Sequence, residues 1–190
     1  MRKLILVPVF LIFLFPGLAQ NKYGLQATAY SGYEKIYNLA KAYARRPVAE
    51  ALKRAQAEFS KEGVGIKIYD AYRPYKATVK FYELYHDTTY VASPYSGSRH
   101  NRGCAIDMTL VELTDQSELQ MPTEYDSFKK EAWPTALVKD PAIRKNRDLI
   151  IRIMEKHGFK VNASEWWHFD FVGWRKFEVM DVDFEELLKQ

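Results

Sequence analysis

Apolar residues recur with the helical period in two long segments of the chain. The first segment begins at Pro47, a residue that is tolerated in a first turn, and ends before Gly63. The second begins with Asp140 as a cap and Pro141 as the first helical residue, and it ends at Gly158. Pro74 starts a further helix between these two segments. We expect helices over 47–62, 74–85 and 141–157, and a short one within 181–190.

A two-residue alternation follows the first helix. Ile66 and Ile68 alternate with polar neighbours, which is typical of a half-buried strand. Helices lie before and between the strands, which predicts an α+β fold, with a small antiparallel sheet packed against several helices. The range 112–134 lacks periodicity and is long for a connection, so it predicts a loop that covers the functional site. The expected strands lie near 64–71, 104–111, 159–163 and 166–172.

The N-terminus has the pattern of a secretory signal peptide. Two basic residues precede an apolar run over 4–15, and the small residues Gly17 and Ala19 follow it. The run is shorter than the roughly 20 residues that span a bilayer, which favours cleavage over an uncleaved anchor. We expect a signal peptide over 1–19 and a single domain over 20–190. The predicted location is the periplasm or cell envelope, with no stable membrane insertion after cleavage.

Charge and cysteine content narrow the possible partners. The chain has 28 Lys and Arg against 24 Asp and Glu, and removing residues 1–19 takes away two of the basic ones. No basic helix or basic-aromatic array is present in the sequence, so we expect no nucleic-acid partner. Cys104 is the only cysteine, which excludes an internal disulfide. A small thiol beside alanine is more often a buried apolar residue than a nucleophile.

Two histidines and two carboxylates form the pattern of a catalytic zinc site. His100, Asp107 and His168 offer three nitrogen or oxygen ligands, which leaves a fourth position for water. Seven residues separate His100 from Asp107, so on one straight strand they would face opposite ways. Gly103 can supply a turn between them, because glycine accepts positive φ. Glu165 is then left over near the metal, where a general base must lie.

These residues carry a family resemblance. The pattern Ser-x-His-x-x-Gly-x-Ala-x-Asp over 98–107, followed by Glu-Trp-Trp-His over 165–168, resembles the VanX-type D-alanyl-D-alanine dipeptidases. That zinc peptidase group has D,D-carboxypeptidases and the hedgehog-type fold as distant relatives. Asp-Ala-Tyr-Arg-Pro over 70–74 and Asn146-Arg147 match further family segments, so the resemblance extends over about 26–172.

The resemblance implies a mechanism and a substrate. It implies one Zn²⁺ per chain, Glu165 as the general base, and Arg73 as the cation that stabilises the developing oxyanion. The alternative for Arg73 is a buried ion pair with Asp70 that only shapes the strand end. A free dipeptide has two charged termini, for which Asp126 is the ammonium candidate and Ser98 the carboxylate candidate. The expected partner is therefore a small D,D-dipeptide from peptidoglycan metabolism.

Departures from the family pattern leave alternatives open. The family has Met-Gly ahead of a Phe-Asp pair, whereas here Pro122 and Tyr125 replace the glycine and the phenylalanine. The family's N-terminal Asn-Phe pair is not evident in Tyr30–Tyr33. Two other functions remain: a D,D- or L,D-carboxypeptidase that trims stem peptides, and a non-catalytic zinc-dependent wall-binding module. The sequence leaves the oligomeric state, the physiological substrate and the metal loaded in the cell open.

Overall fold

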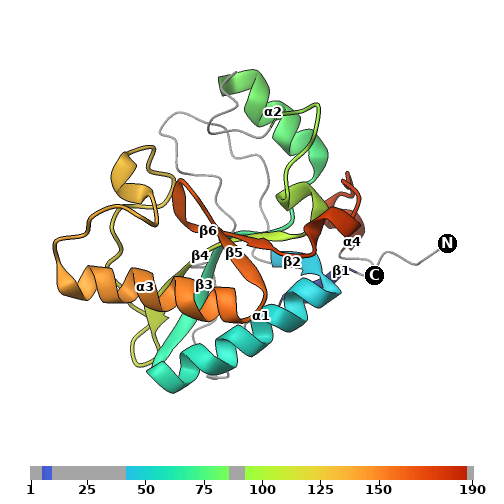
Figure 1. The fold of residues 1–190 in the computed structure, drawn as a ribbon. Coiled ribbons are helices and arrows are strands. Elements are labelled where there is room, and N and C mark those ends of the chain that lie inside the picture. Colours follow the sequence, from blue (N-terminus) through green and yellow to red (C-terminus); the bar gives the residue numbers. More distant parts are fainter. Residues whose placement is uncertain (1–5, 10–41, 86–92, 188–190) are drawn as a thin grey trace.

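A four-stranded antiparallel sheet forms the centre of the fold (Figure 1). The computed structural model describes residues 6–9, 42–85 and 93–187. All four expected strands are present, and each begins and ends within one residue of its expected bounds. The strand order is β3 (Val64–Asp70), β4 (Ala105–Glu112), β6 (Glu165–Phe171) and β5 (Phe159–Asn162).

The expected helices are confirmed, and two of them cover one face of the sheet. Helices α1 and α3 contact each other and the strands of the sheet (Figure 1). The Asp140 side chain accepts hydrogen bonds from the backbone N–H groups of Ala142 (2.7 Å) and Ile143 (3.3 Å), which fixes the start of α3. The helices are α1 (Arg46–Phe59), α2 (Tyr75–Tyr85), α3 (Pro141–Lys156) and α4 (Phe184–Leu187), with 3₁₀ turns η1 (Ser60–Glu62), η2 (His100–Arg102), η3 (Lys130–Ala132) and η4 (Trp174–Lys176).

Strand β4 separates the hydrophobic core from the polar face of the sheet. Ile106, Met108 and Leu110 are fully buried and pack in one cluster with apolar residues of α1 and α3. Since side chains alternate along a strand, Asp107 and Thr109 lie on the opposite face. Cys104 is fully buried in the same core, as expected for a space-filling thiol. The fold therefore presents Asp107 on the face away from the helices.

A β-bulge at the end of β3 changes which residue faces Asp107. The β3–β4 register runs regularly up to Ile68, then shifts so that Asp70 becomes the partner of Asp107. A bulge inserts one extra residue and redirects the side chains that follow it. Asp70 is thereby placed beside the ligand-bearing strand, at the point where the chain leaves the sheet toward Arg73.

The N-terminal segment is described only at residues 6–9. There β1 (Leu6–Val9) pairs antiparallel with β2 (Ala42–Arg45) in a separate two-stranded sheet. The rest of the predicted signal peptide lies outside the described residues, as does Tyr30–Tyr33. The four-stranded sheet contains no residue of 1–19. Within the described ranges, no helix has both the length and the apolar character needed to cross a membrane.

Candidate metal centre and active site

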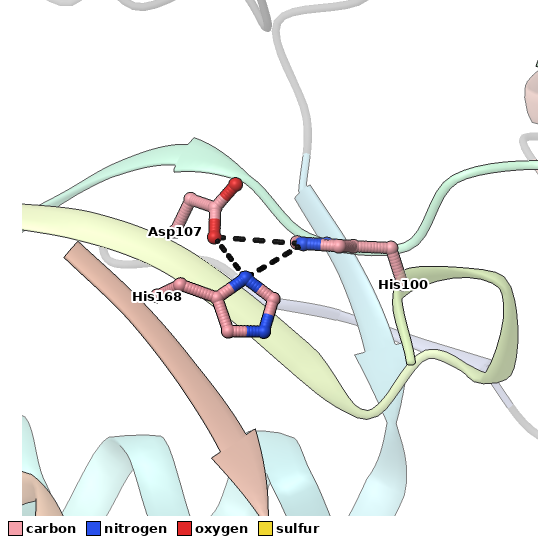
Figure 2. A group of neighbouring side chains, drawn as sticks. All are labelled: His100, Asp107 and His168. Carbon is pink, nitrogen blue, oxygen red and sulfur yellow. Dashed lines mark hydrogen bonds and ion pairs between the residues drawn. The ribbon is translucent and has the colours of Figure 1, made fainter. Parts of the chain in front are cut away.

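The three predicted metal ligands come from three elements and meet on the polar face of the sheet (Figure 2). Asp107 of β4 and His168 of β6 are direct partners in the antiparallel ladder. His100 is the first residue of η2, and Gly103 ends that turn with φ of +65°. The turn expected at Gly103 is thus present, and it brings His100 back over the strand that carries Asp107.

The separations of the three ligand atoms fit a metal ion. Asp107 Oδ1 lies 2.9 Å from His168 Nδ1 and 3.5 Å from His100 Nε2, and the two nitrogens are 3.3 Å apart. Ligand atoms about 2.0–2.2 Å from a tetrahedral zinc ion stand roughly 3.3–3.6 Å apart. Two separations fall in that range and the third is slightly shorter. These residues therefore fit three corners of a zinc site.

Hydrogen bonds behind the two imidazoles aim their free nitrogens inward. His100 Nδ1 lies 2.7 Å from the carbonyl oxygen of Ala71, and His168 Nε2 lies 3.0 Å from Asp170 Oδ1. We assign a ring proton to each outer nitrogen, since both of them face oxygens that accept and cannot donate, and this leaves the inner nitrogens as the metal-binding atoms. The two inner nitrogens lie 3.3 Å apart, and once deprotonated each can offer its lone pair to a cation between them.

The charges in the centre support the same interpretation. Asp107 Oδ1 is buried and has no well-directed hydrogen bond within the described part of the chain. Burial opposes ionisation of Asp107, but the two imidazoles outweigh it and hold the pKa of this carboxyl below its usual range. Burial likewise lowers the pKa of His168, yet Asp107 and Asp170 raise this pKa well above its usual value. Zinc must therefore displace a proton from His168 to bind.

Glu165 lies beside the three ligands. Its Oε2 atom is 3.6 Å from His168 Nδ1, and the Asn162 side-chain amide donates a hydrogen bond to that oxygen at 3.4 Å. Burial, together with the negative charge of Asp107, raises the pKa of Glu165 and outweighs the positive groups nearby. A carboxylate with a raised pKa, next to a metal that it does not bind, has the properties of a general base.

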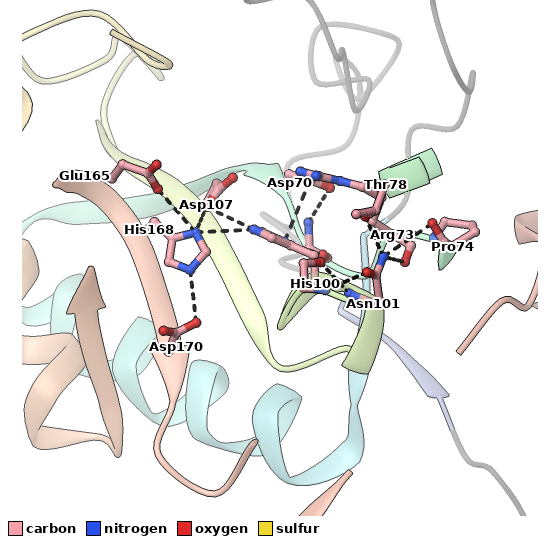
Figure 3. Close-up of polar contacts among 12 residues, drawn as sticks. Asp70, Arg73, Pro74, Thr78, His100, Asn101, Asp107, Glu165, His168 and Asp170 are labelled. Atoms are coloured by element: carbon pink, nitrogen blue, oxygen red, sulfur yellow. Dashed lines mark hydrogen bonds and ion pairs between the residues drawn. The ribbon is translucent and has the colours of Figure 1, made fainter. Parts of the chain in front are cut away.

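Arg73 forms the ion pair with Asp70 that was the alternative to a catalytic role, at the end of β3 (Figure 3). Its Nε donates to Asp70 Oδ2 at 2.9 Å, and Nη2 contacts the same oxygen. The guanidinium carbon also lies 4.9 Å from the ring centre of Phe81. The pair does not remove Arg73 from the site, because its positive charge acts to lower the pKa values of Asp126 and Glu165.

Ser98 has a clear structural role in the η2 turn. Its Oγ accepts a hydrogen bond from the backbone N–H of Asn101 at 3.0 Å, and the backbone N–H of Ser98 donates to Asn101 Oδ1 at 2.7 Å. The Asn101 side chain also donates to the carbonyl oxygen of Arg73 (2.9 Å) and to Thr78 Oγ1 (2.8 Å). Asn101 therefore joins the turn that carries His100 to the segment that carries Arg73 (Figure 3).

Asp126 lies in the long connection between β4 and α3. It adopts φ of +58°, which is uncommon for a residue other than glycine. Burial and then the charge of Asp107 raise the pKa of Asp126 well above its usual range. A carboxyl group in such surroundings gains most from a cationic ligand, since a nearby positive charge favours its ionised form. The loop expected to cover the site is therefore the segment that supplies Asp126.

Sequence reasoning missed several residues that hold the ligands. Asp170 was within reach of prediction, because it is two positions from His168 on one strand and so shares its face. The backbone carbonyl of Ala71 and the linking role of Asn101 carry no sequence signal. Tyr125, whose hydroxyl donates to Asp107 Oδ2 at 3.2 Å, lies in the loop without periodicity. Its neighbour Asp126 had been singled out through the resemblance alone.

Comparisons with known proteins show which family this chain belongs to. Residues 6–185 match the family Peptidase_M15, described as D-ala-D-ala dipeptidase. The D-alanyl-D-alanine dipeptidase of Escherichia coli (strain K12) is 33% identical over 135 residues, covering 71% of this chain and 69% of the relative. The D-alanyl-D-alanine dipeptidase of Enterococcus faecalis (strain ATCC 700802 / V583) is 28% identical, covering 72% of this chain and 76% of the relative.

A solved structure of the vancomycin resistance D,D-dipeptidase VanXYg, in complex with a D-Ala-D-Ala phosphinate analogue, is 22% identical with a TM-score of 0.45. The match covers 70% of this chain and 51% of the VanXYg chain, and the likeness is too low to add to the assignment. The family match spans nearly the whole chain, and the E. coli relative exceeds 30% identity over more than two thirds of it. The resemblance expected from the motifs is confirmed: this chain belongs to the Peptidase_M15 family of D-Ala-D-Ala dipeptidases.

Proposed function

We propose that this protein hydrolyses free D-Ala-D-Ala with one zinc ion per chain, held by His100, Asp107 and His168. The observation that carries the proposal is the meeting of three ligand atoms within 4.8 Å of one another, with the Glu165 carboxylate beside them. The dipeptidase names of the curated relatives support the substrate. These names favour a dipeptidase over the carboxypeptidase alternative, and a wall-binding module would not require Glu165.

Glu165 transfers the proton from the attacking water to the leaving group. A bound zinc ion supplies Lewis acidity, which lowers the pKa of a coordinated water toward about 7. Glu165 accepts the proton of the attacking water and then gives it to the nitrogen of the departing D-alanine. The raised pKa of this carboxyl suits both steps, since a stronger base takes the proton more readily and still releases it to an amine.

Arg73 stabilises the charge that develops on the peptide oxygen. A guanidinium group stays protonated at any working pH and presents its N–H donors in a fixed plane. The ion pair with Asp70 and the contact with Phe81 hold that plane in one orientation before substrate arrives. Charge stabilisation is most effective when the donor does not have to reorient during the reaction.

The two ends of the dipeptide require opposite charges from the protein. Asp126 pairs with the free ammonium, and the substrate in turn stabilises the ionised form of a carboxyl whose pKa is raised. Ser98 donates its hydroxyl proton to the substrate carboxylate. That proton is not used in the η2 turn, where Ser98 Oγ acts as an acceptor.

The substrate panel that tests this function compares free D-Ala-D-Ala, N-acetyl-D-Ala-D-Ala and L-Ala-L-Ala. Acetylation removes the ammonium and leaves Asp126 without its partner, which costs about 2–5 kcal/mol. We expect kcat/KM for the acetylated peptide to be roughly 30- to several thousand-fold lower, as measured on the zinc-loaded protein. The Asp126→Asn variant keeps the shape of the side chain and should narrow that difference. Equal or faster hydrolysis of the acetylated peptide would favour the carboxypeptidase alternative.

We also propose that the protein is exported to the periplasm or cell envelope and acts there in wall recycling. The basic start, the short apolar run and the small residues before Gln20 support export. Loss of 1–19 leaves every proposed ligand and the four-stranded sheet in the chain. The native protein is expected to begin at or near Gln20, which N-terminal sequencing measures. A soluble cytoplasmic form that starts at Met1 would contradict this location.

A further inference from the structure

The two carboxylate oxygens of Asp107 have different surroundings. Oδ1 points toward the imidazoles of His100 and His168, at 3.5 and 2.9 Å. Oδ2 accepts a hydrogen bond from the hydroxyl group of Tyr125, at 3.2 Å. The phenol hydroxyl donates its proton in this contact. One oxygen is thus available to a metal, and the other is already engaged by the protein.

Packing holds the Tyr125 ring in the orientation that this hydrogen bond requires. Tyr69 of β3 stacks on the ring, with centroids 4.3 Å apart and planes inclined by 24°. Trp167 of β6 meets the same ring edge-on at 5.6 Å. Strands on both sides of β4 therefore fix a side chain that comes from the long connecting loop.

We propose that Tyr125 is a positioning residue that makes Asp107 a one-oxygen metal ligand. A carboxylate can bind a metal through one oxygen or through both, and a hydrogen bond to Oδ2 competes with a second bond from that oxygen to the metal. Binding through Oδ1 alone keeps the coordination number at four and leaves room for water. The inference rests on the proposed function for the identity of the metal, but it concerns this chain's own tyrosine, where the family pattern has phenylalanine.

The variant that tests this role is Tyr125→Phe, which removes only the hydroxyl and keeps the ring in its stack. Loss of a group that orients a metal ligand typically weakens metal binding by about 10- to 100-fold. We expect the Zn²⁺ dissociation constant of metal-free protein, measured by competition with a chromophoric chelator, to rise by that amount. The matched control is Tyr69→Phe, which loses a hydroxyl that contacts Glu118 rather than Asp107 and should bind Zn²⁺ within about twofold of wild type.

Cobalt substitution gives a readout that simple packing would not change. Four-coordinate Co²⁺ absorbs more strongly in the visible than five-coordinate Co²⁺. We therefore expect the Co²⁺ form of Tyr125→Phe to lose intensity as the second oxygen of Asp107 binds, while Tyr69→Phe keeps the wild-type spectrum. Thermal unfolding of the metal-free variants separates metal binding from folding: a similar midpoint in both assigns the effect to the metal centre.

Unchanged zinc affinity and an unchanged Co²⁺ spectrum in Tyr125→Phe would overturn the inference, whatever the effect on the unfolding midpoint. This failure is distinct from failure of the proposed function. Wild-type protein that binds zinc but leaves D-Ala-D-Ala intact would defeat the dipeptidase proposal and leave the role of Tyr125 standing. The positioning role alone would fail if the wild-type protein cleaves the dipeptide and Tyr125→Phe has the same Zn²⁺ affinity and the same Co²⁺ spectrum as wild type.

Discussion

Replacing Glu165 with glutamine is expected to lower kcat for D-Ala-D-Ala by about 100- to 10,000-fold, which is the usual contribution of a general acid–base group. The amide keeps the shape of the side chain but cannot accept the proton of the attacking water. Glu165 is not among the three atoms that meet at the metal position, so the variant should still bind one zinc ion. Steady-state kinetics and elemental analysis on the same preparation measure both quantities.

A glutamate on the covering loop provides the control for this experiment. Glu124→Gln makes the same chemical change at an exposed position and should leave kcat within a few-fold of wild type. Activity of Glu165→Gln close to that of the control would remove Glu165 from the mechanism. Loss of zinc from Glu165→Gln would instead show that this carboxylate takes part in holding the metal.

Replacing His168 with alanine is expected to remove stoichiometric zinc and, with it, the activity. Zinc sites with four protein ligands bind with about 10–16 kcal/mol, so one ligand accounts for roughly 3–4 kcal/mol, or about 100- to 1,000-fold in affinity. The variant also leaves the buried Asp107 with one fewer positive neighbour. Chelator competition and metal analysis measure the loss.

The comparison variant is His157→Ala. His157 lies at the end of α3 and contacts Glu58 at 2.9 Å, away from the three ligands. It should retain one zinc ion per chain and near-normal activity. Full zinc occupancy in His168→Ala would show that the ligand set has been assigned wrongly, since a site of this kind does not keep its affinity after losing one of three side chains.

Local sequence patterns were sufficient for the fold because each strand and helix is marked by its own residues. The alternation around Ile66 and Ile68 reflects a strand with one face on the core, and the capping aspartate of α3 is visible from the sequence. The bulge before Asp70 was not predicted. It depends on pairing with β4, and no alternation within β3 alone shows where the register shifts.

The site was predictable only as far as its residues act through their own chemistry. His100, Asp107 and His168 predict a metal site because histidine and aspartate side chains bind metals in many proteins. The role of Ser98 in the η2 turn and of Tyr125 at Asp107 depends on which segments meet in space. Contacts of that kind depend on the packing of the whole domain. The residues of 112–134 show no periodicity from which such contacts could be predicted.

Asp107 and His168 are direct partners in the ladder between β4 and β6. A metal ion that binds both side chains therefore requires the native register of these two strands. A slip of one residue between these strands would turn His168 toward α1 and α3 and separate the two ligands. Misaligned folding intermediates would then have no metal site, and only the native alignment would gain the binding energy. Zinc present during folding would therefore favour the correct pairing, in a chain whose single cysteine cannot form an internal disulfide.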